Sequence, residues 1–87
     1  MEYTYVAIIR NSESGGYRIN FPDLRGCLTR VEHESELMSY AMEILSGYIK
    51  ARIDNGEDFP EPRLSLEEIS INRKISVTVN VEDTIQN

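Results

Sequence analysis

The chain has 87 residues, a length that allows one modest core. Hydrophobic residues make up 40 % of it and charged residues 28 %, a composition unlike that of disordered segments. Its 15 acidic residues outnumber 9 basic ones, and the net charge of −6 disfavours direct binding to nucleic-acid phosphates. The sequence has no apolar run long enough to cross a membrane, and its first residues do not resemble a signal peptide. We therefore expect one cytoplasmic domain.

Two strands are predicted at the start of the chain. Residues 2–10 are rich in β-branched and aromatic types, which favour strands. Turn-forming residues follow, and Gly15 and Gly16 supply the positive φ angles of a tight reversal. Residues 17–21 then alternate apolar and polar side chains until Pro22, which cannot donate to a strand ladder. The pattern predicts an antiparallel hairpin.

A third strand is predicted after the loop at residues 22–26, because apolar and polar side chains alternate over residues 27–32. This strand begins at Cys27, the one cysteine of the chain, so an intrachain disulfide and a four-cysteine zinc site are both excluded. We expect Cys27 to be a small buried hydrophobic residue and not a reactive thiol.

A long helix is predicted from about residue 33 or 34 to about residue 55. Glutamates cluster at its start and basic residues near its end, as the helix dipole favours. Asn55-Gly56 suits a left-handed C-terminal cap. The apolar stripe consists of Leu37, Met38, Ala41, Leu45, Tyr48, Ile49 and Ile53, widened by Met42 and Ile44.

The end of the chain carries a short helical turn and a last strand. Residues 65–69 suit the turn, and residues 75–81 alternate β-branched with polar side chains. The element order is therefore β-β-β-α-β. It predicts a two-layer α+β fold in which a three-stranded meander and a returning strand pack on one long helix.

Residues that could support catalysis do not form a recognisable set. His33 lies among glutamates near the helix start, where a surface position is expected, and no nucleophile elbow or phosphate-binding loop occurs. Arg18, Arg25 and Arg30 fall in the meander and could form a small patch, but nearby acids argue against a nucleic-acid site. We expect no catalytic residues, no metal and no cofactor.

A resemblance extends over nearly the whole chain and is most specific at residues 15–27, Gly-Gly-Tyr-Arg-Ile-Asn-Phe-Pro-Asp-Leu-Arg-Gly-Cys. This segment is similar to the signature of HicB-like antitoxins, and Asn55-Gly56-Glu57 and residues 60–62 and 65–69 match as well. The resemblance implies a partial RNase H-like fold. It also implies the antitoxin of a type II toxin–antitoxin pair, which binds and occludes HicA, a small basic mRNA-cleaving toxin. We expect the chain itself to form a homodimer or tetramer.

Three features depart from the family pattern. Arg25 stands where the family usually has proline, His33 stands where it often has threonine, and the helix is bulkier than the usual alanine-rich version. Many members continue into a DNA-binding domain, whereas this sequence ends at Asn87. We therefore expect a single HicB-like domain over residues 1–87 without a C-terminal DNA-binding domain, and no direct DNA binding.

The expected toxin contacts are exposed residues in and beside the 22–26 loop, with two acids to attract a basic partner: Asp23, Leu24, Arg25, Glu32 and Glu34. One alternative is an orphan HicB-like interaction or oligomerisation module, in which strand 75–81 pairs with its copy in another subunit. A second alternative is a vestigial RNase H-like nuclease, whose metal-dependent cleavage would be lost on replacing acids such as Asp23 or Glu36.

Overall fold

The computed structural model describes residues 2–68 and 73–81. It confirms the predicted element order, with 3₁₀ turns before and after the long helix. The elements are β1 (Glu2–Asn11), β2 (Tyr17–Asn20), β3 (Leu28–Val31), a 3₁₀ turn (Glu34–Glu36), α1 (Leu37–Asp54), a second 3₁₀ turn (Leu66–Glu68) and β4 (Lys74–Asn80).

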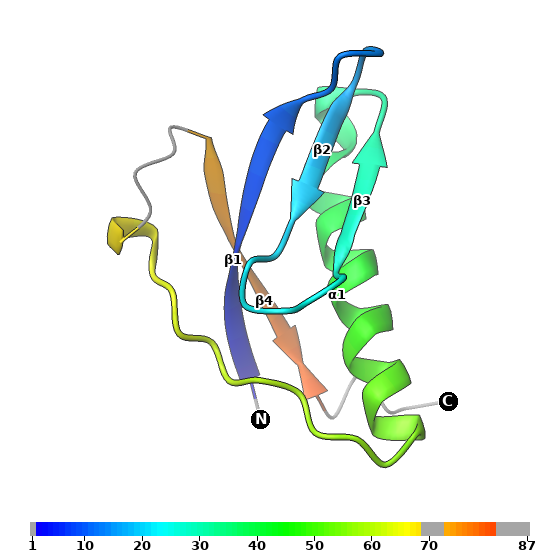
Figure 1. Cartoon of the computed structure of the whole chain (residues 1–87), viewed down its shortest axis with the longest axis vertical. Coiled ribbons are helices and arrows are strands. Elements are labelled where there is room, and N and C mark those ends of the chain that lie inside the picture. Colours follow the sequence, from blue (N-terminus) through cyan, green and yellow to red (C-terminus); the bar gives the residue numbers. More distant parts are fainter. Residues whose placement is uncertain (1, 69–72, 82–87) are drawn as a thin grey trace.

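The strands form one sheet in the order β3-β2-β1-β4, and each neighbouring pair is antiparallel. Helix α1 lies behind this sheet in Figure 1 and packs on one of its faces, giving the expected two-layer α+β arrangement. The strand β4 returns beside β1, so β3 and β4 are the two edges of the sheet over the described residues.

The hairpin between β1 and β2 depends on the predicted glycine reversal. Gly16 has a φ angle of +74°, and a Cβ atom placed on it would lie 2.5 Å from the carbonyl oxygen of Val31. A side chain at this position would therefore collide with the β3 backbone as well as strain its own. The reversal sets the register in which Ile9 faces Ile19 and Arg10 faces Arg18.

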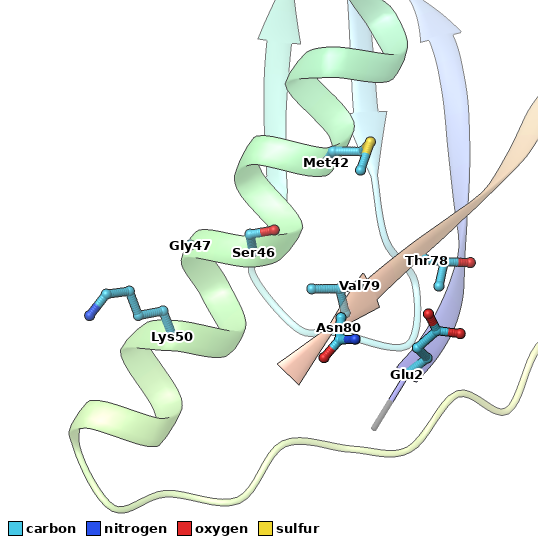
Figure 2. Close-up of a pocket in the computed structure, with 8 residues that line it drawn as sticks. All are labelled: Glu2, Met42, Ser46, Gly47, Lys50, Thr78, Val79 and Asn80. Atoms are coloured by element: carbon cyan, nitrogen blue, oxygen red, sulfur yellow. The ribbon is translucent and has the colours of Figure 1, made fainter. Parts of the chain in front are cut away.

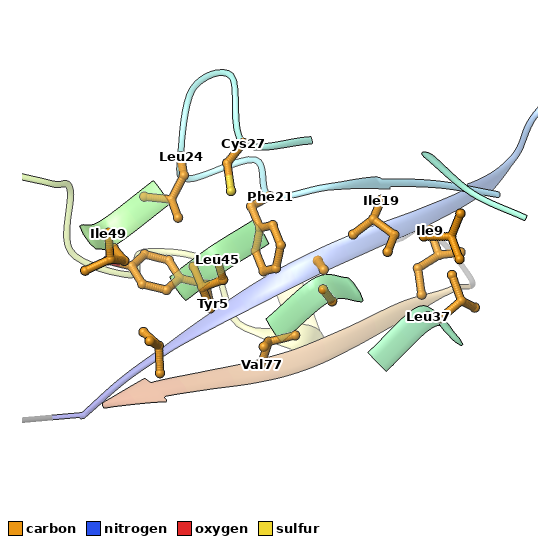
Figure 3. Packing of buried hydrophobic residues seen from close by; sticks show 14 residues of the cluster. Tyr5, Ile9, Ile19, Phe21, Leu24, Cys27, Leu37, Leu45, Ile49 and Val77 are labelled. Atoms are coloured by element: carbon orange, nitrogen blue, oxygen red, sulfur yellow. The ribbon is translucent and has the colours of Figure 1, made fainter. Parts of the chain in front are cut away.

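The main core lies between the sheet and α1 (Figure 3). Tyr5, Phe21 and Ile19 are among its largest fully buried side chains. The helix contributes a buried row at four-residue spacing, Leu37, Ala41, Leu45 and Ile49. Cys27 is buried in the same cluster, as expected.

The apolar stripe of α1 is narrower than the sequence predicts. Met38 and Met42 are each 47 % exposed, so their assignment to the core stripe is wrong. Each follows a member of the buried row by one residue, which is a rotation of about 100° around the helix axis. The predicted C-terminal cap is confirmed, since Gly56 has a φ angle of +69° and its N–H donates to the carbonyl of Ile53.

The opposite, outer face of the sheet has a small second core. Val6 and Ile8 are buried there beneath Leu64, which belongs to the connection between α1 and β4. This connection, yellow-green in Figure 1, therefore packs on the sheet instead of extending into solvent. The long crossing lets β4 pair antiparallel with β1.

Candidate partner-binding site

The loop between β2 and β3 is closed by its own backbone. The N–H of Phe21 donates to the carbonyl of Cys27, the N–H of Leu24 donates to the carbonyl of Phe21, and the N–H of Cys27 donates to the carbonyl of Leu24, each at 3.0 Å. This tight loop turns the Leu24 side chain into the main core, on the side of Ile49 (Figure 3). The expectation that Leu24 is exposed is wrong, because the side chain is fully buried.

Asp23, next to Leu24, is half-buried and holds another part of the chain. Its Oδ2 atom accepts hydrogen bonds from the backbone N–H groups of Arg63, at 2.8 Å, and Leu64, at 3.0 Å. The carboxylate thus fixes the connection that covers the outer face, a role that the sequence did not indicate. Arg25, also in this loop, is exposed and available to a partner.

Glu34 lies at the other end of β3 within a small polar cluster. Its Oε1 atom lies 2.9 Å from Nη2 of Arg73 and accepts a hydrogen bond from the Tyr17 hydroxyl at 3.2 Å. The Arg73 guanidinium also lies 5.1 Å from the centre of the Tyr17 ring. The hydrogen bond from Arg73, followed by that from Tyr17, lowers the pKa of Glu34. Glu34 is therefore an exposed acid that stays ionised at neutral pH.

Glu32 is exposed at the same end of β3, and its Oε1 atom lies 3.4 Å from Nη1 of Arg30. Since Glu32 and Glu34 follow β3 and the 22–26 loop precedes it, the expected contact residues fall at opposite ends of that strand. The structure therefore places Glu32 and Glu34 at one end of β3, each beside a different arginine, and Asp23 and Arg25 at the other end.

A groove that the sequence analysis did not identify lies between α1 and β4 (Figure 2). It has a volume of about 450 Å³ and runs around the β4 edge of the sheet. Gly47 leaves its helical wall open, because no atom lies within 4 Å of where a Cβ would stand. Two helix residues could have indicated this groove from the sequence, the apolar Met42 and the small Gly47, because neither belongs to the buried row of α1. Met42, Ser46, Gly47 and Lys50 line one wall, and Thr78, Val79 and Asn80 line the other.

Groups with catalytic or metal-binding potential are spread over the fold. Burial raises the pKa of the Cys27 thiol to about 11, and its Sγ lies 3.9 Å from the carbonyl oxygen of Ile44. His33 is exposed, and its side chain makes no capping hydrogen bond. Over residues 2–68 and 73–81, no three histidine, cysteine or acidic side chains are grouped closely enough to hold a metal ion. No helix in that part of the chain is long and apolar enough to span a membrane.

Comparison of the sequence with protein families gives a match over residues 5–85 to the family described as HicB-like antitoxin of bacterial toxin-antitoxin system. The UPF0150 protein Ta0767 of Thermoplasma acidophilum is 33 % identical over 67 residues, which is 77 % of this chain and 94 % of that protein.

Three solved structures with a similar fold come from toxin–antitoxin systems. A toxin–antitoxin complex from Streptococcus pneumoniae has a chain with a TM-score of 0.73 and 22 % identity, covering 100 % of this chain and 75 % of the other. A chain of a HicA3 and HicB3 toxin–antitoxin complex has a TM-score of 0.64 and 22 % identity. The match covers 92 % of this chain and 96 % of that one. The N-terminal domain of Burkholderia pseudomallei antitoxin HicB has a TM-score of 0.67 and 19 % identity. This match also covers 92 % of this chain and 96 % of the other. At these identities the likeness is one of fold.

Proposed function

The chain belongs to the HicB-like antitoxin family, and from that premise we propose that it binds a small basic HicA-like toxin and occludes the toxin's RNA-cleaving site. The observation that carries this proposal is the family match over residues 5–85, nearly the whole described domain. The chain would act by binding in the cytoplasm and not as a catalyst.

Surface charge supports a basic partner. The chain has a net charge of −6, and the exposed acids Glu32 and Glu34 both follow β3, each beside an arginine. A net negative charge speeds the encounter with a cationic protein and does so less at high salt. We place toxin contact at Glu32 and Glu34, with Arg25 as a further exposed contact at the other end of β3. Leu24 and Asp23 act instead within the fold.

The test is co-purification of the full chain with the small basic protein encoded beside it, followed by titration of that protein's RNA cleavage. Tight binding that weakens with salt and stops cleavage supports the proposal. A chain carrying Glu32→Gln and Glu34→Gln should associate more slowly, whereas Glu67→Gln, an exposed acid elsewhere, should not. Binding without any effect on cleavage would contradict occlusion of the toxin site.

We also propose self-association through β4, the basis of the alternative interaction module. The specific observation is that β4 is an edge strand of the sheet formed by residues 2–68 and 73–81, beside the groove lined by Met42. Two β4 strands pairing antiparallel about Val77 would place Ile75 opposite Val79, so the apolar face would continue across the junction. This arrangement predicts a two-fold symmetric dimer.

Light scattering of the purified chain tests self-association. Met42→Lys puts a charge beside the β4 edge and should shift a dimer to monomer. Tyr40→Lys changes another partly exposed residue of α1 that does not line the groove and should leave the mass unchanged. A monomer for the unsubstituted chain at all concentrations would overturn this second proposal without affecting the first.

A further inference from the structure

Three arginines stand side by side on the outer face of the sheet. Arg10 of β1 is the register partner of Arg18 of β2, which in turn is the partner of Arg30 of β3. All three side chains are exposed, and they alternate with the core residues that face α1. Like charges directly opposite each other destabilise a sheet, so folding does not account for this arginine row.

The members of the row differ in their existing contacts. Nη2 of Arg30 donates to the carbonyl of Gly15 at 2.6 Å, and Nη1 lies near Glu32. Neither Arg10 nor Arg18 makes an ion pair within residues 2–68 and 73–81. Two guanidinium groups of an otherwise acidic chain are therefore available to an anionic ligand.

A hollow with an apolar floor adjoins the row. It has a volume of about 380 Å³ and is lined by Ile8, Asn20 and Leu28 together with Arg10 and Arg18. Leu28 is 59 % exposed, the highest fraction among the exposed large hydrophobic side chains of the described residues. The surface thus combines positive charge with a place for an apolar group, and protein interfaces likewise combine an apolar core with an enrichment in arginine.

We propose that this surface binds an acidic helical segment of a protein other than the toxin, with carboxylates on the arginine row and an apolar side chain in the hollow. Neighbouring strands lie about 4.8 Å apart. Residues three or four apart on a helix have Cβ atoms about 5–6 Å apart, so successive glutamates can meet successive arginines. Arginine pairs with carboxylate through two parallel hydrogen bonds.

Nucleic acid and the toxin fit this surface less well. Within the described strands, the outer face carries no aromatic ring on which a base could stack, since its β1–β3 residues are Glu2, Thr4, Val6, Ile8, Arg10, Arg18, Asn20, Leu28 and Arg30. The chain's net charge of −6 opposes a long polyanion more than a short acidic helix. A basic toxin would be repelled by the row.

The experiment uses the full chain and a labelled helical peptide of about 20 residues, long enough to be helical, with glutamates at four-residue spacing beside a row of leucines. The peptide with glutamine at those positions and an oligouridine RNA are the comparison probes. We expect salt-sensitive binding of the glutamate peptide, measured by fluorescence anisotropy. Arg18→Gln should weaken it about tenfold, the effect of ~1.4 kcal/mol.

Arg63→Gln is the matched control, because it removes an exposed arginine outside the row and should change the affinity less than about twofold. Leu28→Ala should weaken binding without changing its salt dependence. Three results would overturn the proposal: no binding of the glutamate peptide, equal losses in Arg18→Gln and Arg63→Gln, or tighter binding of the RNA that depends on Arg18. Thermal unfolding of each variant shows that the fold is retained.

Discussion

Asp23 and Leu64 are joined by a 3.0 Å hydrogen bond from the Leu64 N–H to the Asp23 carboxylate, although 41 positions separate them in the chain. The same oxygen accepts the N–H of Arg63. One carboxylate in the β2–β3 loop thus holds the connection that covers Val6 and Ile8 on the outer face. The sequence predicts that Asp23 is a surface contact for a partner, but in the fold its carboxylate binds another segment of the same chain.

Replacing Asp23 with alanine should lower the free energy of unfolding by ~1.5–3 kcal/mol, the range for hydrogen bonds to a charged group. Because Asp23 is only half-buried, we expect the lower part of this range. Hydrogen exchange should show faster exchange of the Arg63 and Leu64 amides. Asp58→Ala, which removes an exposed acid of the same connection, is the control and should change neither quantity. An unchanged exchange rate of the Leu64 amide in Asp23→Ala would show that the Asp23 carboxylate does not stabilise the connection between α1 and β4.

The local elements were predictable because each is encoded by nearby residues. Alternating side chains predict the hairpin strands and β4, and Asn55-Gly56 predicts the end of α1. The outer-face core was not predictable, because it depends on where a connection without periodic pattern crosses the sheet. Leu64 and Asp23 meet only as a result of that crossing.

The candidate site was predicted less well than the fold. Leu24 is expected at the surface because loop residues usually lie there. Three backbone hydrogen bonds close this loop, and the Leu24 side chain points into the core. The arginine row could not be predicted for a different reason. The sequence places Arg18 and Arg30 in the meander, but only the strand register aligns them with Arg10 and separates them from Arg25.

The buried row of α1 should dominate the stability of the domain. Leu45 is fully buried between helix and sheet, so Leu45→Ala should lower the free energy of unfolding by ~2–5 kcal/mol. Met42→Ala removes a side chain that is 47 % exposed and should cost less than about 1 kcal/mol. Urea denaturation measures both. Similar losses for the two variants would mean that α1 packs on a different face.

The Tyr5 hydroxyl should make stability depend on alkaline pH. It donates a hydrogen bond to the carbonyl of Pro60, and burial, followed by nearby Tyr3, raises its pKa from 10.0 to about 12. Because the folded state holds the proton more tightly, this contribution is fully present below pH 10.0 and is lost as the pH rises toward about 12. The free energy of unfolding should therefore fall in this window for the unsubstituted chain and fall less for Tyr5→Phe. Parallel pH profiles for the two proteins would contradict the assignment.

Cys27 should be almost inert toward thiol reagents in the folded chain. Its side chain is buried and its pKa is raised to about 11, so at about pH 8 both access and thiolate content are low. The remaining reaction with a disulfide reagent must pass through an opening of the fold. If that opening is global unfolding, Leu45→Ala should speed the reaction about tenfold for every ~1.4 kcal/mol of stability lost.

A different opening would give a different result for the same thiol. If the β2–β3 loop opened alone, Asp23→Ala would speed the reaction of Cys27 while Leu45→Ala would leave it nearly unchanged. We expect the global route, because Cys27 shares one core cluster with Leu45 and Phe21, and its N–H donates to Leu24 within the closed loop. Comparing the two variants at one pH therefore distinguishes a loop that opens by itself from one that unfolds with the core.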